Sequence, residues 1–278
     1  MEDGVRELWR EARRLLDQAI EDTVSGLPEA GAVEAARYIT GGGKRFRGFL
    51  VIVVCRALGG TVEDALEAAV AVELVHASSL ALDDIIDADL YRRGKPSSWL
   101  TEGVSKTVMV SNLLVPLAQE IVYKAYGDKA LALTVRAWLD TSRGEVLDAF
   151  TGDADYLETV RLKTGALFRL AAQLGAVAAG AWRLVEDLGG YGELLGIAYQ
   201  VADDTVDLAL GRDTQGARML VSWLGTRSID KAVDAAYSYA ARASEVAEKL
   251  TGCSVLREIP FFMVKAMLRE AGLGGNSG

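Results

Sequence analysis

Two short acidic motifs in this sequence have the composition and spacing to hold a metal ion. Residues 83–87 read Asp-Asp-Ile-Ile-Asp, and residues 203–207 read Asp-Asp-Thr-Val-Asp. At 100° per residue, the first and last aspartates of each motif share one helix face, about one turn apart. The middle aspartates, Asp84 and Asp204, lie to one side, as further ligands or as supporting partners. Carboxylate oxygens in this number suit Mg²⁺, which takes one or two carboxylates together with waters and substrate phosphates.

Basic segments elsewhere in the chain provide the opposite charge. A single basic segment is usually an ordinary cluster of surface charge. A single acidic motif is usually a solvated helix end. Together they favour two diphosphate groups, one bridged to aspartates by metal and one held directly by Lys and Arg. The GxxxxGK[ST] spacing of a P-loop is absent. The basic segments are Gly42-Gly43-Lys44-Arg45-Phe46-Arg47, Arg92-Arg93-Gly94 and Lys163-Thr164-Gly165.

His76 is the single histidine of the chain, and it precedes Asp83 by seven residues, two turns along the same helix face. This placement favours contact with a substrate over the role of a buried core residue. Gln200 stands in a similar relation to the second acidic motif, three residues before Asp203. One histidine excludes zinc sites built on several of them and leaves little room for histidine acid–base chemistry.

Composition narrows the class of protein. The chain has 278 residues and a net charge of −9, which argues against a nucleic-acid partner held by phosphate contacts. Two cysteines are too few for a disulfide scaffold and are typical of a reducing compartment. The start of the chain lacks the pattern of a secretory signal, and the apolar run at 49–55 is too short to span a bilayer. We therefore expect a cytoplasmic protein without stable membrane insertion.

Nearly every segment has helical rather than strand periodicity, and no linker divides the chain. We expect one all-α domain over 1–278. Thr61 and Asp64 form a capping-box start, and Pro116 predicts a kink or break near Asn112. Residues 211–225 show no clear period. The predicted helices are 4–25, 61–89, 101–126, 128–151, 155–180, 186–210, 226–250 and 254–271.

The ordered motifs resemble the trans-isoprenyl diphosphate synthases of the polyprenyl synthetase family, which includes farnesyl and geranylgeranyl diphosphate synthases. The matches run in the family's order over residues 42–207. They comprise the Gly-Gly-Lys-Arg-Phe-Arg turn, His76 with Asp-Asp-Ile-Ile-Asp, Arg92-Arg93-Gly94, Gly144-Glu145, Lys163-Thr164-Gly165 and Tyr199-Gln200 with the second acidic motif. The resemblance implies a bundle of mostly antiparallel helices around a central cavity, and a homodimer, with a heteromer as the alternative.

The resemblance also implies substrates and residue roles. Asp83 and Asp87 would bind two Mg²⁺ and Asp203 a third, with Asp84, Asp204 and Asp207 in support. The diphosphate of isopentenyl diphosphate would contact Lys44, Arg47, His76 and Arg93. The allylic diphosphate would contact Arg92, Lys163, Thr164 and Gln200. Ionisation of the allylic substrate, attack by isopentenyl diphosphate and loss of a proton to pyrophosphate would follow.

Product length should depend on the residues one turn below the first acidic motif, about 6 Å toward the helix N-terminus. In the family, aromatic residues there block the growing chain. Here the positions hold Ser78 and Ser79, with Val75 and Val72 below. We therefore expect a product of geranylgeranyl length or longer, unless the segment 108–112 closes the tunnel.

The sequence departs from the family pattern at several positions. Gly48 replaces a usual Pro, Ser111-Asn112 replaces a common Gly-Asp pair, and Glu145 replaces a frequent Gln. The segment 208–220 after Asp207 is shortened, with Arg212 and Arg218 as its cations. This leaves open a weakly active or regulatory subunit of a heteromeric synthase. A terpene cyclase would carry a different second motif and would not need the Gly-Gly-Lys-Arg-Phe-Arg turn.

Overall fold

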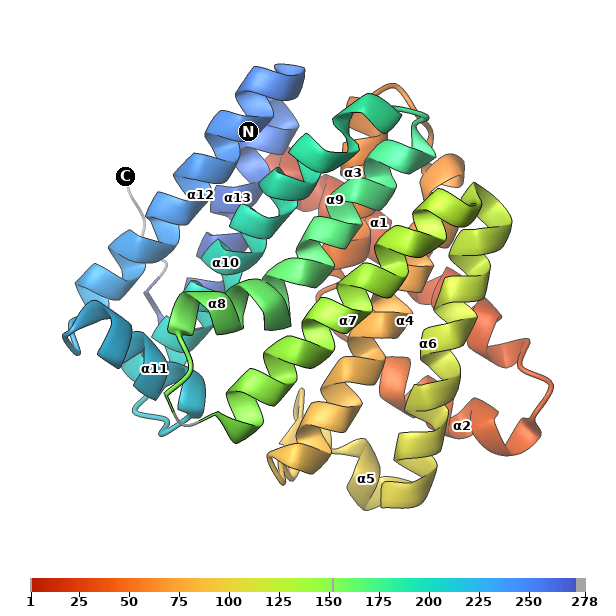
Figure 1. Cartoon of the computed structure of the whole chain (residues 1–278), viewed down its shortest axis with the longest axis horizontal. Coiled ribbons are helices and arrows are strands. Elements are labelled where there is room, and N and C mark those ends of the chain that lie inside the picture. Colours follow the sequence, from red (N-terminus) through yellow and green to blue (C-terminus); the bar gives the residue numbers. More distant parts are fainter. Residues whose placement is uncertain (1, 152, 274–278) are drawn as a thin grey trace. The chain divides into compact units, whose positions relative to one another are not determined.

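The computed structural model describes residues 2–151 and 153–273, which form helices joined by short turns (Figure 1). The all-α prediction is confirmed. The α-helices are α1 (Glu2–Ser25), α2 (Ala30–Thr40), α3 (Phe46–Ala57), α4 (Val62–Ile86), α5 (Ser98–Thr101), α6 (Val104–Tyr126), α7 (Asp128–Phe150), α8 (Tyr156–Val160), α9 (Ala166–Ala178), α10 (Val185–Ala209), α11 (Gln215–Leu224), α12 (Ile229–Thr251) and α13 (Ser254–Leu268). A π-helix, η1, spans Arg161–Gly165, and short 3₁₀ turns, η2 and η3, span Trp182–Leu184 and Arg269–Ala271.

The described residues pack into two compact units. The first unit comprises Leu8–Trp138 and Leu174–Ala181, and the second comprises residues 2–7, 139–151, 153–173 and 182–273. Each unit contains one of the two acidic motifs. The single domain over 1–278 stays a prediction, and its ends at 1 and 274–278 lie outside the described residues.

In the first unit, α4 is the central helix and packs against α3, α6 and α2. It begins at the predicted capping box, in which the Thr61 hydroxyl accepts from the Asp64 N–H and Asp64 accepts from the Thr61 N–H. Burial continues around most of its circumference between Ala65 and Ala81, with Glu73 as a buried charged residue in that stretch.

Helix α4 is also long and apolar enough to cross a membrane by length and composition. However, 72% of its most apolar stretch is buried inside the protein. This is the pattern of the core helix of a globular unit, and it matches the packing of α4 against α2, α3, α5 and α6.

In the second unit, α10 packs along α12 and α13 (Figure 1). The contact between α10 and α12 is lined by alanines, which let the two backbones approach closely. Tyr191, buried on α10, donates to the Leu256 carbonyl at 2.8 Å and ties α10 to α13. These contacts pack α10, which carries the second acidic motif near its C-terminal end, against α12 and α13.

Several predicted element boundaries need correction. Residues 211–225 contain α11, which buries only Ala217 and Leu220 and so shows too little apolar periodicity to predict. The predicted helix 155–180 is divided into α8, the π-helix η1 and α9. Helix α6 continues through Asn112 and Pro116, so the predicted break near Asn112 is absent, whereas the kink stays a prediction. Residues 91–96 form a hairpin of two short strands, β1 (Tyr91–Arg92) and β2 (Lys95–Pro96).

Candidate active site

The acidic end of α4 separates its three aspartates into different environments. Asp87 caps the helix, its N–H donates to the Asp83 carbonyl at 2.9 Å, and its side chain is exposed. The Asp83 side chain is 12% exposed, one turn earlier on the same face. Asp84 is buried instead. The outer pair therefore has the i, i+4 arrangement that the sequence predicts for metal ligands, whereas Asp84 occupies a supporting position.

Asp84 is held by the first arginine of the hairpin. Arg92 Nε donates to Asp84 Oδ1 at 2.6 Å, and the same guanidinium lies 3.9 Å from Asp83 Oδ2. Burial raises the pKa of the Asp84 carboxyl above its ordinary value, although the bond from Arg92 opposes that shift. Arg92 is thus fixed beside Asp83, with its guanidinium about one third exposed.

The turn between α2 and α3 brings Lys44 and Arg93 to the same region. Gly43 has a φ of 101°, and a side chain there would lie 2.9 Å from the guanidinium of Arg93. Arg93 also donates to the Gly41 carbonyl at 3.1 Å. The Trp9 indole donates to the Lys44 carbonyl at 2.7 Å, which fixes the backbone beneath the ammonium group. The glycines of this motif therefore allow an arginine to lie directly against the turn.

Arg47 and His76 form a hydrogen-bonded pair in the same unit. Arg47 Nη1 lies 2.9 Å from His76 Nε2, and since a guanidinium can only donate, Nε2 accepts and the ring proton is on Nδ1. Burial and then the charge of Arg47 lower the pKa of His76 well below its ordinary value. The histidine is therefore neutral at pH 7. We name Lys44, Arg47, His76, Asp83, Asp84, Asp87, Arg92 and Arg93 the first half-site.

The predicted chain-length positions on α4 are all buried. The Ser78 hydroxyl donates to the Leu74 carbonyl and the Ser79 hydroxyl to the His76 carbonyl, each at 2.9 Å. Both hydroxyls are thus satisfied within their own helix, so these serines present small, effectively apolar surfaces. Val75 is buried as well. On α6, which packs against α4, the predicted segment 108–112 buries Val110 and Ser111, whereas Asn112 is exposed.

The second acidic motif separates in the same way as the first. Asp203 and Asp207 are partly exposed, one turn apart on α10, and Asp204 is buried. Tyr156 donates to Asp204 Oδ2 at 2.6 Å, and Gln200 Nε2 donates to Asp204 Oδ1 at 3.0 Å. Burial raises the pKa of Asp204 to about 7, against the two hydrogen bonds that lower it. Its position is again that of a supporting partner.

Gln200 also links the motif to Thr164. The Thr164 hydroxyl donates to Gln200 Oε1 at 2.7 Å, so Thr164, Gln200 and Asp204 form one hydrogen-bonded chain. Tyr156 ends this chain, and its role was not predictable from the sequence, because no spacing rule connects it to Asp204, 48 positions away. We name Lys163, Thr164, Gln200, Asp203, Asp204 and Asp207 the second half-site.

Lys163 is positioned by helix α7. Its ammonium lies 2.6 Å from Asp148 Oδ2 and 2.8 Å from Glu145 Oε2. It sits in the π-helix η1, and π-turns inside helices are frequent at functional sites. Asp148 was not predicted, although its place three residues after Glu145 on one helix face was a usable signal. Glu145 at the position of a frequent Gln therefore adds a second carboxylate to Lys163.

Gly144 lets α7 lie against the backbone of Lys163, and replacing this glycine tests that contact. A Cβ at Gly144 would lie 2.3 Å from the backbone nitrogen of Lys163. We expect Gly144→Ala to destabilise the protein by about 2 kcal/mol or more, because neither backbone can move freely. Gly190, on the exposed face of α10 with nothing within 4 Å, is the matched control. Thermal unfolding should show a lower Tm for Gly144→Ala and an unchanged or higher one for Gly190→Ala; equal Tm values would contradict the close contact.

The donor set fits Mg²⁺. Among residues 2–151 and 153–273, no three His, Cys, Asp or Glu side chains converge to form a complete metal cage. Each half-site instead offers two outward carboxylates, which is the number that Mg²⁺ uses when waters and phosphates complete its octahedron. Asp83 with Asp87, and Asp203 with Asp207, would hold the ions.

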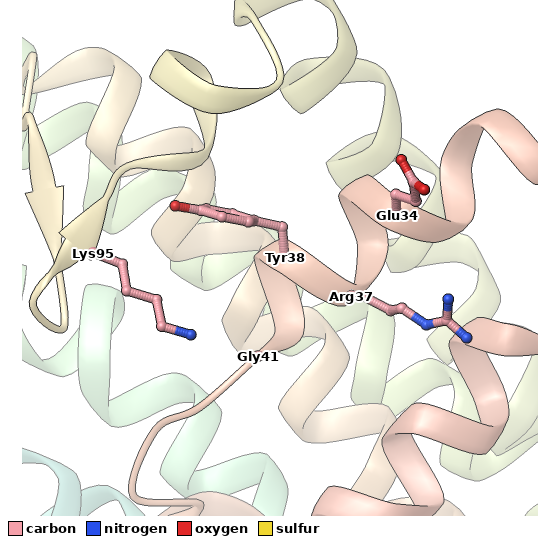
Figure 2. Close-up of a pocket in the computed structure, with 5 residues that line it drawn as sticks. All are labelled: Glu34, Arg37, Tyr38, Gly41 and Lys95. Carbon is pink, nitrogen blue, oxygen red and sulfur yellow. The ribbon is translucent and has the colours of Figure 1, made fainter.

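A pocket of about 310 Å³ lies beside the first half-site, and the sequence did not predict it. It is lined by Glu34, Arg37, Tyr38, Gly41 and Lys95. Figure 2 shows Lys95 extending from the hairpin beneath the Tyr38 ring. The Tyr38 hydroxyl donates to the Pro96 carbonyl at 2.6 Å and so joins α2 to the hairpin. The charges of the lining are mixed, and Arg37 is paired with Glu21 at 2.7 Å.

Comparison with known proteins agrees with the motif order. A model of the polyprenyl synthetase family matches residues 30–220, more than half of the chain. The hexaprenyl pyrophosphate synthase of Saccharolobus solfataricus is 34% identical, over 97% of this chain and 99% of that protein. A Caulobacter crescentus polyprenyl synthase, complexed with calcium and isoprenyl diphosphate, superposes with a TM-score of 0.81 at 26% identity, over 95% and 97% of the two chains. A geranylgeranyl pyrophosphate synthetase from Pyrococcus horikoshii gives 0.80 at 26% identity, over 96% and 98%.

Proposed function

This chain belongs to the polyprenyl synthetase family of trans-isoprenyl diphosphate synthases, and from that premise we propose that it condenses isopentenyl diphosphate with an allylic diphosphate. The observation that carries the proposal is the pairing of each acidic motif with cationic side chains suited to diphosphate. Arg92 lies 3.9 Å from Asp83 in the first motif, and Arg212 lies 3.0 Å from Asp207 in the second. A protein that bound only a metal would not need these donors.

In the first half-site, Lys44, Arg47, His76 and Arg93 would hold the diphosphate of isopentenyl diphosphate. Arginine and lysine suit this role because they donate to phosphate oxygens and neutralise their charge. His76 adds a polar contact without charge, since it is neutral and its Nε2 is already occupied by Arg47. It is therefore poorly suited to act as a general base.

In the second half-site, Lys163, Thr164 and Gln200 would hold the allylic diphosphate, and Arg92 would add a guanidinium to the same group. Magnesium, three ions per site as in the family pattern, would neutralise charge that develops on the departing pyrophosphate. The ammonium and guanidinium groups of the chain stabilise the same charge from fixed positions. Because His76 is neutral with Nε2 occupied, we propose that the proton lost after condensation goes to pyrophosphate.

The product is proposed to be geranylgeranyl diphosphate or longer, because Ser78, Ser79 and Val75 are small. We also propose a cytoplasmic enzyme that forms a homodimer. The proteins reported above are named for hexaprenyl and geranylgeranyl products, so family membership leaves the length open. The weakly active or regulatory subunit of a heteromeric synthase is the competing proposal, based on the short connection after Asp207.

A product assay tests the function directly. The purified protein would be incubated with Mg²⁺, isopentenyl diphosphate and each allylic primer from dimethylallyl upward, and the products separated by length. We expect polyprenyl diphosphates of twenty carbons or more. Lys44→Ala should raise the KM for isopentenyl diphosphate, whereas a cyclase, which takes one substrate, would be nearly unaffected. Folded protein that turns over no primer would favour the partner-subunit proposal.

The connection between α10 and α11 is short, and in this proposal Arg212 supplies a cation there for the allylic diphosphate. Its Nη1 lies 3.0 Å from Asp207 Oδ1, and its side chain is 60% exposed. We expect Arg212→Ala to raise the KM for the allylic substrate about tenfold, the loss of one charge-assisted hydrogen bond, without changing that for isopentenyl diphosphate. Arg218, paired with Asp213 on the surface, is the control and should have no effect. Equal effects of the two variants in steady-state assays would refute this role.

A further inference from the structure

The turn that carries Lys44 is anchored by a buried arginine next to it. Arg45 has a left-handed backbone, with φ 56° and ψ 32°, at the residue that precedes α3. Its side chain is 3% exposed; Nη2 donates to the Thr40 carbonyl at 2.7 Å and Nε to Asp17 Oδ1 at 2.8 Å. A non-glycine residue in this conformation costs free energy and persists only where its surroundings hold it. The side-chain contacts of Arg45 therefore hold the turn in place.

Glu73 of α4 is the buried partner of this arginine. Its side chain is 3% exposed, and Oε2 lies 3.5 Å from Arg45 Nη1. Its other oxygen, Oε1, accepts a hydrogen bond from the Gly48 N–H at 2.8 Å. The Glu73 carboxylate thus contacts the chain on both sides of Arg47, at Arg45 before it and at Gly48 after it. We name Arg45, Glu73 and Gly48 the clasp.

Gly48 is required for this arrangement in two ways. A Cβ there would lie 2.8 Å from Leu16 Cδ1 and 3.0 Å from Glu73 Cγ, so a larger residue would push both side chains away from their present positions. A proline would also lack the N–H that Glu73 receives. Gly48, which stands where the family usually has Pro, is therefore needed for the contact with Glu73.

The clasp and the first half-site share the same helix. Glu73 precedes His76 by three residues, on one face of α4, and His76 accepts from Arg47. Movement of Glu73 relative to Gly48 would therefore shift Arg47 against His76 and Lys44 against Arg93. No other described contact joins α4 to both ends of the Lys44–Arg47 segment through one side chain.

We propose that Glu73 is a positioning residue for isopentenyl diphosphate, acting through Arg45 and the Gly48 N–H on Lys44 and Arg47. The inference rests on the proposed function, because it assigns those two cations to that substrate. It predicts a selective effect: loss of the clasp weakens the binding of isopentenyl diphosphate and leaves the allylic substrate unchanged.

The test compares Glu73→Gln with Val70→Ala. Glutamine keeps an oxygen that can accept from Gly48 but removes the charge that pairs with Arg45. We expect a KM for isopentenyl diphosphate raised about tenfold, and an allylic KM within about twofold of wild type. Val70, one turn before on α4 and buried, lacks any contact with the clasp among those described. Val70→Ala should lower Tm without changing either KM.

A binding measurement and a second variant separate the possible outcomes. Calorimetric titration with isopentenyl diphosphate alone should show weaker binding to Glu73→Gln than to wild type. If wild type neither binds isopentenyl diphosphate nor makes product, the proposed function fails. If wild type does both and Glu73→Gln binds equally well, or if both KM values rise together, the clasp is structural only and the positioning role is overturned. Gly48→Ala, which keeps the N–H but adds a Cβ, should reproduce the selective loss.

Discussion

Replacing Asp83 or Asp203 by alanine should reduce kcat about a thousandfold or more while the protein remains folded. Each is a partly exposed member of its acidic motif, on the helix face that offers two carboxylates to a metal ion. A bound divalent ion supplies several kcal/mol of stabilisation to charge that develops on a phosphate leaving group. Since about 1.4 kcal/mol corresponds to a factor of ten, the loss of one ion accounts for an effect of this size.

Single-turnover and steady-state assays over a range of Mg²⁺ concentrations would measure this effect. A variant that loses a metal ligand should require more Mg²⁺ for the activity that remains. Asp213→Ala is the matched control, because Asp213 lies six residues after Asp207, is 86% exposed and pairs only with Arg218 among the contacts described. Its activity should equal that of wild type. Near-normal turnover in Asp83→Ala or Asp203→Ala would show that the motifs are not metal sites.

The middle aspartates should behave differently. Asp204 is buried between Tyr156 and Gln200, so Asp204→Ala would leave the Tyr156 hydroxyl without its acceptor. That change acts first on the stability of α10 and α8, whereas Asp203→Ala acts on the metal. We therefore expect Asp204→Ala to lower Tm more than Asp203→Ala does, and Asp203→Ala to act mainly on kcat.

The spacing of the acidic motifs was predictable because it is a local property of the helix. Asp83 with Asp87, and Asp203 with Asp207, share a face wherever the segment is helical. The burial of Asp84 and Asp204 was not predictable in this way. It depends on Arg92 in a hairpin and on Tyr156, 48 residues from Asp204, and neither partner leaves a periodic signal.

The π-helix that contains Lys163 was also not predictable from the sequence pattern. The sequence Lys163-Thr164-Gly165 predicts an ordinary α-helix, because no residue type is characteristic of a π-turn. Gly144 gives no local signal of its packing role, yet the absence of a side chain there is what lets α7 reach the Lys163 backbone. Strands of two residues, as in the 91–96 hairpin, are too short to show alternation.

Filling the positions below the first acidic motif should shorten the product. In Ser78→Phe/Ser79→Phe, aromatic rings replace two buried serines whose hydrogen bonds, among the residues that the structure describes, stay within their own helix. If the growing chain extends along this face of α4, about 6 Å from Asp83, the rings will block it. We expect the main product to change from twenty carbons or more to fifteen, as measured by chromatography of the dephosphorylated alcohols.

The matched control for that variant is Ser78→Ala/Ser79→Ala. Because each hydroxyl is bonded to a carbonyl of its own helix, alanine should preserve both the open surface and the product length. Overpacking by two rings costs about 1–3 kcal/mol at each position, so a thermal unfolding curve must show that the phenylalanine variant is folded at the assay temperature. The two single variants would then identify which position lines the path. Unchanged product length in the folded double variant would place the path elsewhere and remove the basis for assigning length to these serines.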